Sequence, residues 1–461
     1  MNIDKIIEKV PNYTSFLTVD ELDASTLQLA KEYPEVVSVF EAGKSRKGHS
    51  ILCSKVGTGS KNALFFAFPH PNEPIGAMTI EFLERELVEN KELRESFDYT
   101  WYFIKCVDPD GTKLNENWFK GPFNIYNYSR NFFRPGSIEQ VEWTFPISYK
   151  NLTFDTPMPE TRAIMNVIEQ VKPEFMYSLH NAGFGGAYWY ISHPYADIYD
   201  DLRKSAEKQG VALHLGEPES PSAVEFSQSI YKMLGIEDEY DFIEKYTDAA
   251  PEEEIMCGSS SASYAERFND CVTFLTELPY FFDKRIQDLS PSTMTRREAI
   301  HESVNISSDM FEKMDGLLEN IRSYISDDNP FPLLVDQMID SMGAQAEAKK
   351  KWAEQEEFAE IATISEEFDN LVVSRFYHGL CVGMVARCAR FEMDRIKEQG
   401  LKNDAAVEQL LAVEEQAVQM LKENSDYLEK HMDYEVIPIQ TLVKIQVECG
   451  LIVAKHRAEK E

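Results

Sequence analysis

The stretch FFAFPHPNEPIGAM, residues 65–78, decides how this chain is expected to fold. Its run of aromatic and small apolar residues stops at Pro69, which is typical of a strand covered on both faces of a sheet. Pro74 is well placed for the first turn of a helix that follows. His70 and Glu73 therefore occupy the loop between a buried strand and a helix.

That loop is a candidate site. Functional groups in open α/β sheets gather at the carboxyl ends of the strands, and imidazole and carboxylate are both ligands for zinc. A His-x-x-Glu pair alone is a weak signal, because the pattern is common and Glu is favoured near a helix N-terminus in any case. His180 strengthens the signal, since it ends a second short apolar strand and precedes Gly183. The other histidines lack a strand-end position and are interpreted as structural or surface groups.

Short apolar runs alternate with amphipathic segments up to about residue 288, which predicts an α/β domain with a mixed central sheet flanked by helices. The predicted strands are 36–42, 50–56, 63–68, 99–107, 175–179 and 272–278, and the predicted helices are 22–33, 75–93 and 159–171.

Helical periodicity dominates from residue 289 onward. Two domains are therefore expected, with residues 1–288 forming the α/β domain and residues 289–461 an all-α C-terminal domain. The segment SDDNPFP, residues 326–332, is expected to interrupt the helices. One helix face is expected to carry Val407, Leu410, Leu411, Val418, Leu421 and Leu428.

Composition limits the partners. The chain has 461 residues and a formal net charge of −33, which disfavours nucleic acid and anionic membrane surfaces. No signal-peptide core and no apolar run of membrane-spanning length stands out. The seven cysteines form no CxxC pair, which favours reduced thiols and a cytoplasmic location.

The order of several short motifs resembles the zinc carboxypeptidases of the carboxypeptidase A type, the M14 metallopeptidases. The resemblance covers roughly residues 12–285. It rests on the lead-in YPEVVSVFEAGKSRKGHSILCSKVG and on HPNEPIG, DPDG, YSRNFF, SLHNAG and TFLTELPYF, in that order.

The resemblance implies a site and a reaction. His70, Glu73 and His180 would bind Zn²⁺, and Glu277 would be the general base for the attacking water. Arg130 would bind the terminal carboxylate of a peptide through paired hydrogen bonds.

Three further residues are expected to bind the substrate. Ser129 and Asn131 flank Arg130, and Tyr264 is the local candidate for an aromatic residue that closes the pocket.

The chain departs from the family pattern at two positions of the site. Ser129 stands where the family usually has asparagine. The family often has an arginine after the DPDG-like turn to stabilise the oxyanion, and here Lys120 and Arg134 are the candidate cations. The segment MCGSSSAS, residues 256–263, is expected to line the side-chain pocket without an acid, which disfavours a terminal Lys or Arg.

Three functions stay open at this stage. The first is a metallocarboxypeptidase that acts on peptides. The second is a zinc deacylase of N-acyl amino acids, resembling the aspartoacylase and succinylglutamate desuccinylase group. The third is a non-catalytic peptide-binding protein. The helical domain is expected to pack against the α/β domain, and a homo-oligomer formed through it is left open.

Overall fold

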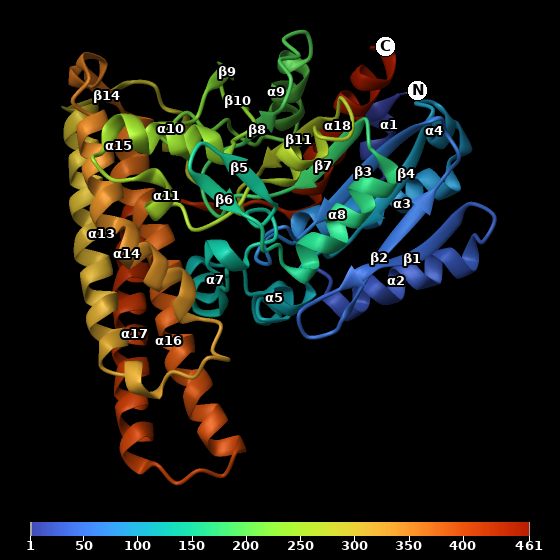
Figure 1. The fold of residues 1–461 in the computed structure, drawn as a ribbon. Helices are drawn as coiled ribbons and strands as arrows, with labels where there is room; N and C mark the ends of the chain where they lie inside the picture. Colours follow the sequence, from blue (N-terminus) through green and yellow to red (C-terminus); the bar gives the residue numbers. More distant parts are fainter. Residues whose placement is uncertain (1, 461) are drawn as a thin grey trace.

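The apolar run before Pro69 forms β3 (Lys61–Ala67), at the centre of the main sheet. A computed structural model describes residues 2–460 (Figure 1). Its main sheet has nine strands in the order β1-β2-β4-β3-β7-β11-β8-β10-β9. The other strands are β1 (Val37–Lys44), β2 (Ser50–Val56), β4 (Tyr99–Ile104), β7 (Phe175–Leu179), β8 (Tyr188–Ile191), β9 (Glu225–Ser227), β10 (Ile230–Lys232) and β11 (Val272–Glu277).

The sheet is mixed, as the sequence predicts. Strands β4, β3, β7 and β11 are parallel to one another, while β1, β2 and β8 introduce antiparallel pairs. The register aligns Ala67 of β3 with Leu179 of β7, and Ser178 of β7 with Leu275 of β11. The carboxyl ends of these three strands therefore lie at one edge of the sheet.

Alternation along β3 explains why its apolar run is continuous. Ala63, Phe65 and Ala67 face a cluster that includes residues of helix α3 (Ile75–Glu89) and helix α18 (Ile439–Glu459). Leu64 and Phe66 face a second cluster with helix α8 (Pro159–Val171). Because successive side chains point to opposite faces, a strand covered on both sides needs apolar residues at every position.

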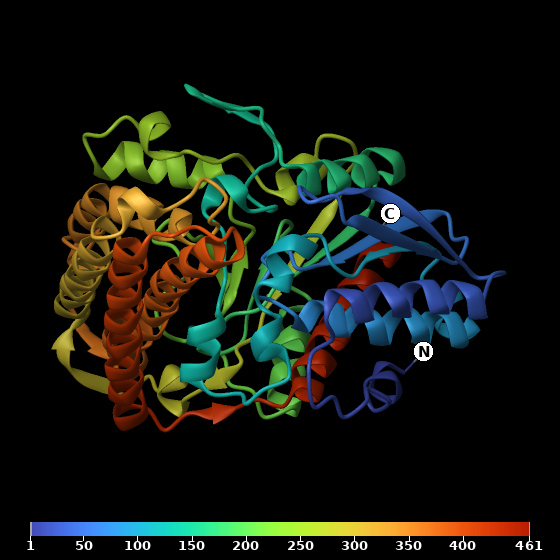
Figure 2. The ribbon, with the colours of Figure 1, turned by 90° about the horizontal axis from the view of Figure 1, so that it is seen from below.

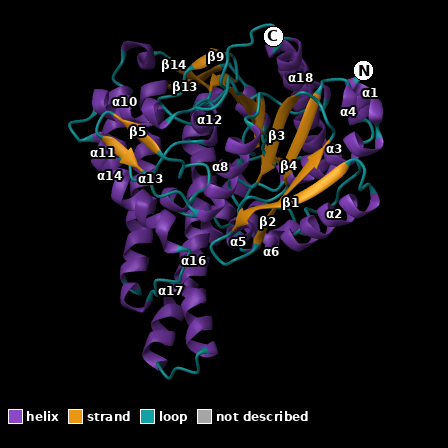
Figure 3. Cartoon of the chain, turned by 45° about the vertical axis from the view of Figure 1, so that its right-hand side comes forward, coloured by secondary structure: helices purple, strands orange, loops and turns teal. Residues whose placement is uncertain are grey.

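Further helices and short strands surround the sheet (Figure 3). They are α1 (Ile3–Ile7), α2 (Val19–Glu32), α4 (Lys91–Glu95), α5 (Pro109–Lys113), α6 (Glu116–Phe119), α7 (Ile125–Asn131), β5 (Ile147–Tyr149), β6 (Leu152–Phe154), α9 (Tyr199–Lys208), α10 (Ile236–Tyr246), α11 (Pro251–Glu254), α12 (Ser261–Ala265) and β12 (Phe281–Phe282).

The C-terminal part is helical and stands beside the sheet in Figure 1. It contains β13 (Pro291–Thr295), α13 (Arg296–Glu319), α14 (Pro332–Trp352), β14 (Ile361–Thr363), α15 (Ile364–Phe368), α16 (Ser374–Glu398), α17 (Asp404–His431) and β15 (Glu435–Val436). The segment 326–332 separates α13 from α14, which confirms the predicted interruption. Leu411 is a correction, because it is 41% exposed while Leu410, Leu421 and Leu428 are buried.

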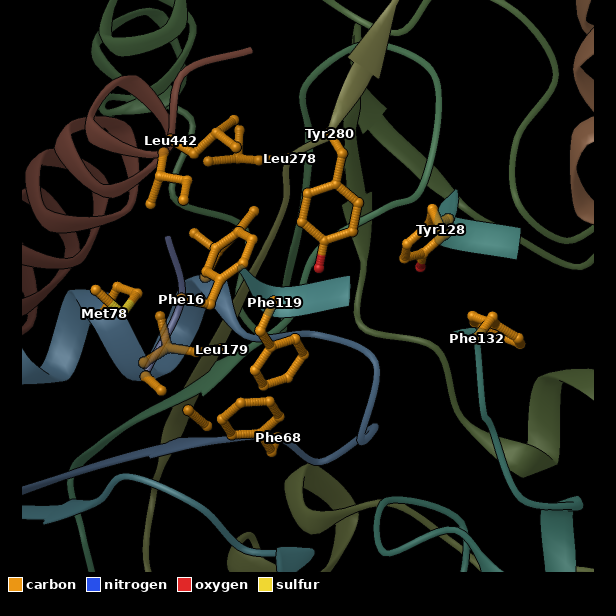
Figure 4. Packing of buried hydrophobic residues seen from close by; sticks show 14 of the residues in the cluster. Phe16, Phe68, Met78, Phe119, Tyr128, Phe132, Leu179, Leu278, Tyr280 and Leu442 are labelled. Atoms are coloured by element: carbon orange, nitrogen blue, oxygen red, sulfur yellow. The ribbon is translucent and has the colours of Figure 1, made fainter. Parts of the chain in front are cut away.

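The last helix leaves the bundle and returns to the sheet. Strand β15 pairs with β12, and α18 then packs against α3, α9, β7 and β11. Figure 2 shows α18 beside the N-terminal helices, away from α16 and α17. Leu442 of α18 belongs to the same apolar cluster as Leu278, Tyr280 and Tyr128 (Figure 4). Residues 289–461 are therefore not one spatially separate block, and the predicted boundary at 288 stays a prediction.

Among residues 2–460, no helix has the length and apolar character needed to cross a membrane. The seven cysteines are all free, and all but Cys257 are buried.

Candidate active site

The loop after β3 places His70 and Glu73 at the carboxyl edge of the sheet. Phe68 adopts a left-handed conformation with φ 58°, which turns the chain sharply where the strand ends. Helix α3 then begins at Ile75 and packs tightly on the strand ends. A Cβ on Gly76 would lie 2.5 Å from the Cβ of Leu179, so glycine permits this close approach.

His180 joins these two residues from the end of β7. Each of the three side chains offers a ligand atom, and these atoms lie within 4.8 Å of one another. The Nδ1 of His180 is 3.1 Å from Glu73 Oε2, while its Nε2 is 2.9 Å from the hydroxyl of Ser178. The nitrogen that faces the cluster is thus distinct from the one held by the strand.

The chemistry of these donors fits a divalent metal ion. All three side chains are buried, and His70 Nδ1 has no hydrogen-bond partner among the described residues. Burial, together with Arg134 and His180, holds the pKa of His70 well below its usual range. The lowered pKa of His70 favours its neutral imidazole, which is the form that binds a metal.

Glu277 ends strand β11 beside this cluster. Its Oε1 lies 3.9 Å from His180 Nδ1, and the residue is only 7% exposed. Burial raises the pKa of Glu277 well above its usual range, and the charge of Glu73 raises it further. The structure thus brings a second carboxylate to the three candidate ligands.

Arg134 is the cation in direct contact with the cluster. Its Nη1 lies 3.1 Å from Glu73 Oε1, and its Nε donates to Gln140 Oε1 at 3.3 Å. Lys120, the other cation considered from the sequence, pairs instead with Glu21 at 2.8 Å and donates to the carbonyl of Phe16. The geometry therefore favours Arg134 as the cation of the site.

Arg130 points toward the helical part of the molecule. Its Nη2 donates to Glu414 of α17 at 3.0 Å, and Arg390 pairs with the same carboxylate. Its neighbours are also engaged, since Asn131 donates to the carbonyl of Asn127 and Ser129 is buried where Gly383 of α16 approaches its carbonyl. Among residues 2–460, the ion pair of Arg130 is with Glu414, and none is formed with Glu73 or Glu277.

Tyr264 has contacts of its own as well. Its ring is buried in the apolar cluster beneath α8, and its hydroxyl donates to Glu169 Oε1 at 2.6 Å. To close over a substrate, as the sequence predicts, Tyr264 would have to leave both contacts.

The segment 256–263, which is expected to line the side-chain pocket, is joined to an acid from elsewhere in the chain. Ser261 donates to Glu142 Oε1 through both its backbone N–H, at 3.1 Å, and its hydroxyl, at 2.8 Å. Glu142 belongs to a segment more than 100 residues earlier in the chain, so no local pattern in the sequence links it to Ser261.

Helices α16 and α18 supply two further residues that the sequence did not reveal. Gln446 of α18 donates to the backbone carbonyl of His180 at 2.7 Å. Tyr377 of α16 donates to the carbonyl of Phe184 at 3.2 Å. Both residues lie in the part of the chain that was expected to form a separate domain, so only the tertiary structure identifies them.

Comparison with known proteins decides the family. The family model of the zinc carboxypeptidases (Peptidase_M14) matches residues 22–268, more than half of the chain. This chain belongs to the zinc carboxypeptidase family. The matched region of this family member includes His70, Glu73 and His180 and ends before Glu277.

Individual relatives are similar over shorter regions. Zinc carboxypeptidase A 1 of Drosophila melanogaster is 33% identical over 132 residues, which is 24% of this chain and 30% of that protein. Carboxypeptidase B of Astacus astacus is 28% identical over 105 residues, 22% of this chain and 35% of that protein. The matches thus span about a third of each relative.

Among solved structures, carboxypeptidase A from Helicoverpa armigera is 16% identical, with a TM-score of 0.39. That comparison covers 60% of this chain and 70% of the other.

Proposed function

We propose that this protein is a metallocarboxypeptidase that removes the C-terminal residue of peptides by zinc-dependent hydrolysis. The observation that supports it most strongly is the meeting of His70, Glu73 and His180 at one sheet edge, with Glu277 beside them. Family membership supports the same reaction class.

His70, Glu73 and His180 are the proposed zinc ligands. Two imidazoles and one carboxylate are a ligand set of catalytic zinc sites that leave one position open, and carboxypeptidase A is known for the same set. When bound, zinc would polarise the scissile carbonyl and increase the acidity of a water molecule. His70 Nδ1, which has no hydrogen-bond partner within residues 2–460, is consistent with this use.

Glu277 is the proposed general base. Its carboxylate would take a proton from the attacking water and deliver it to the nitrogen of the leaving amine. Its position at the end of a central strand keeps the side chain in a fixed place, and its burial strengthens its interactions with charged groups of the site.

Two arginines are proposed for the charges of the substrate. Arg134, in contact with Glu73, would stabilise the negative charge that develops on the carbonyl oxygen. Arg130, with Ser129 and Asn131, remains the proposed anchor for the terminal carboxylate on the strength of its motif. It would first have to exchange Glu414 for the substrate.

The alternative of a zinc deacylase of N-acyl amino acids is not favoured, because the matching family model is that of the carboxypeptidases. A cytoplasmic location is a further proposal, supported by the seven free cysteines. A homo-oligomer formed through the helical part also remains a proposal.

Substitution of the proposed base tests the reaction. We expect Glu277→Gln to lower kcat by about 10³-fold or more, since proton transfer is lost, while zinc stays bound. Metal analysis of both proteins and hydrolysis of peptides with free or amidated C-termini measure this. Zinc-loaded wild-type protein that cleaves none of the free peptides, or a Glu277→Gln variant of full activity, would contradict the proposal.

A further inference from the structure

Arg387, on helix α16, is a half-buried cation that binds backbone carbonyls. Its Nη1 donates to the carbonyls of Asn131 and Phe132 at 2.6 and 2.9 Å, and its Nη2 donates to the carbonyl of Leu114 at 2.7 Å. No Asp or Glu within residues 2–460 forms an ion pair with it, unlike Arg130. Burial and the charge of Arg130 lower the pKa of Arg387 to about 10, so the guanidinium is charged at neutral pH.

Two of these carbonyls lie at the C-terminal end of helix α7. The last carbonyls of a helix have no partner within it and carry the negative end of its dipole, so a cation is stabilised there. Helix α16 packs closely against α7 (Figure 1), and Gly383 leaves no room for a Cβ beside the carbonyl of Ser129. Arg387 therefore caps α7 from the helical part of the molecule.

The third carbonyl belongs to the segment that follows the DPDG turn. Leu114 precedes Asn115, whose side chain is bonded to the backbone of Phe133 in both directions. Its Oδ1 accepts from the N–H of Phe133 at 2.9 Å, and its Nδ2 donates to the carbonyl of Phe133 at 2.9 Å. Arg387 and Asn115 together thus fix the backbone of residues 131–133.

The next residue along the chain is Arg134, the cation in contact with the candidate metal ligands. Its Nη1 lies 3.1 Å from Glu73 Oε1. A group that stabilises developing charge must be held in place before the reaction begins, and a displacement of about 1 Å can cost up to about 10²-fold in rate. The position of Arg134 thus depends on the backbone that precedes it.

We propose that Arg387 is a positioning residue, which holds Arg134 against Glu73 by fixing the backbone of residues 131–133. This inference rests on the proposed peptidase function and adds to it a residue beyond 22–268, the region that the family model matches. It gives the helical part of the molecule a role in the reaction, although Arg387 itself touches no reacting atom.

Substitution of Arg387 tests this role. With zinc-loaded full-length protein, we expect Arg387→Met to lower kcat by about tenfold and to change KM by less than about twofold, because Arg134 is displaced from the developing charge. Arg387→Lys keeps a charged donor for the carbonyls and should lose only about threefold. Thermal unfolding verifies that each variant is folded. Full kcat in Arg387→Met, or in Arg387→Lys if the first variant does not fold, would overturn the inference.

The matched control is Arg395→Met, in the same helix. Arg395 donates to Glu392 at 2.6 Å and to Gln399 at 3.4 Å, so its partners lie in α16 or directly after it. We expect this variant to keep the kcat of the wild type. A loss equal to that of Arg387→Met would show that any disturbance of α16 lowers the rate, and would overturn the inference.

A double-mutant cycle distinguishes positioning from a general loss of packing. Arg134→Met alone should lower kcat by about 10²-fold, since the proposed charge stabilisation is lost. If Arg387 acts through Arg134, adding Arg387→Met to that variant should lower kcat by less than about threefold more. A further loss of about tenfold, equal to the loss in the wild-type background, would overturn the inference.

A structural measurement separates this inference from the proposed function. Crystal structures of the zinc-loaded wild type, Arg387→Met, Arg387→Lys and Arg395→Met need no turnover. We expect the 3.1 Å contact between Arg134 and Glu73 to be lost in Arg387→Met and kept in Arg395→Met. That result supports the inference even if no peptide is cleaved, which would contradict only the peptidase function. An unchanged contact in Arg387→Met overturns the inference.

Discussion

The carboxyl group of Asp108, in the DPDG motif, shows how burial changes one residue beside the candidate site. Its Oδ1 accepts from the backbone N–H of Gly111 at 2.9 Å and begins helix α5, while its Oδ2 is buried without a partner among the described residues. Gly111 in turn approaches Pro71 in the loop between His70 and Glu73. Burial raises the pKa of Asp108 to about 7.

The raised pKa predicts a pH-dependent stability. Between the unperturbed pKa of 3.8 and about 7, the folded protein keeps a proton that the unfolded chain releases, so the free energy of unfolding falls as pH rises. Asp108→Asn removes this titration and retains an acceptor for Gly111. We expect its stability relative to wild type to rise by up to about 4 kcal/mol between about pH 4 and pH 8.

Denaturant unfolding at several pH values measures this difference. Asp155→Asn, at an exposed position, is the control for replacing a carboxyl group by an amide outside the core. A constant difference in unfolding free energy between Asp108→Asn and wild type across the range would contradict the predicted ionisation.

At the scale of elements, the strands that carry the site were predictable, and their helical support was not. Strands β2 and β7 and helix α8 have the predicted bounds, because each is a clear apolar or amphipathic run. Strands β9 and β10 have three residues each, which is too few to establish an alternating pattern.

The candidate metal ligands were predictable from the sequence as well. His70, Glu73 and His180 were predicted because the carboxyl ends of strands meet at one edge of a sheet. Gln446 was not found, because it reaches the backbone of His180 from a distant segment and no local pattern identifies its partner. Helix α18 is buried on most of its surface, which explains its broad apolar composition without revealing what covers it.

The two hydrogen bonds of Gln446, in helix α18, predict a specific role for this residue. Its amide donates to the carbonyl of His180, and its Oε1 accepts from Thr79 of α3 at 2.8 Å. Gln446→Leu leaves both partners buried and unpaired, so we expect a loss of about 2–4 kcal/mol in stability. Zinc affinity should fall by about tenfold, because the backbone that carries His180 is less firmly held.

Chemical unfolding and competition with a zinc chelator give the two readouts for Gln446→Leu. Gln440→Leu is the matched control in the same helix, since Gln440 donates to the carbonyl of Val10. It should lower stability without changing zinc affinity. Equal zinc affinity in both variants would show that Gln446 has only a general packing role.

At the scale of the whole molecule, the C-terminal part is expected to be required for folding. A chain ending at residue 288 would lack α18 and expose the apolar face that α3, β7 and β11 present to it. We therefore expect such a chain to be aggregated or without fixed tertiary structure by near-UV circular dichroism. A protease site inserted in the exposed 399–403 connection is the control, since cleavage there should leave both pieces associated. A stable, active 1–288 fragment would contradict this expectation and would support the predicted domain boundary.

The contact between Arg130 and Glu414 joins the helical bundle to the proposed chemistry. If Arg130 anchors a terminal carboxylate, Glu414 competes with the substrate for the same guanidinium. Glu414→Gln weakens that competitor, and we expect KM for peptides with a free C-terminus to fall by about three- to tenfold with kcat unchanged. Amidated peptides should show no such change, because they present no carboxylate.

Glu415→Gln, at an exposed neighbouring position on α17, is the matched control and should match wild type. An unchanged KM for free peptides in Glu414→Gln would mean that Arg130 serves to hold the bundle and that another group binds the substrate carboxylate.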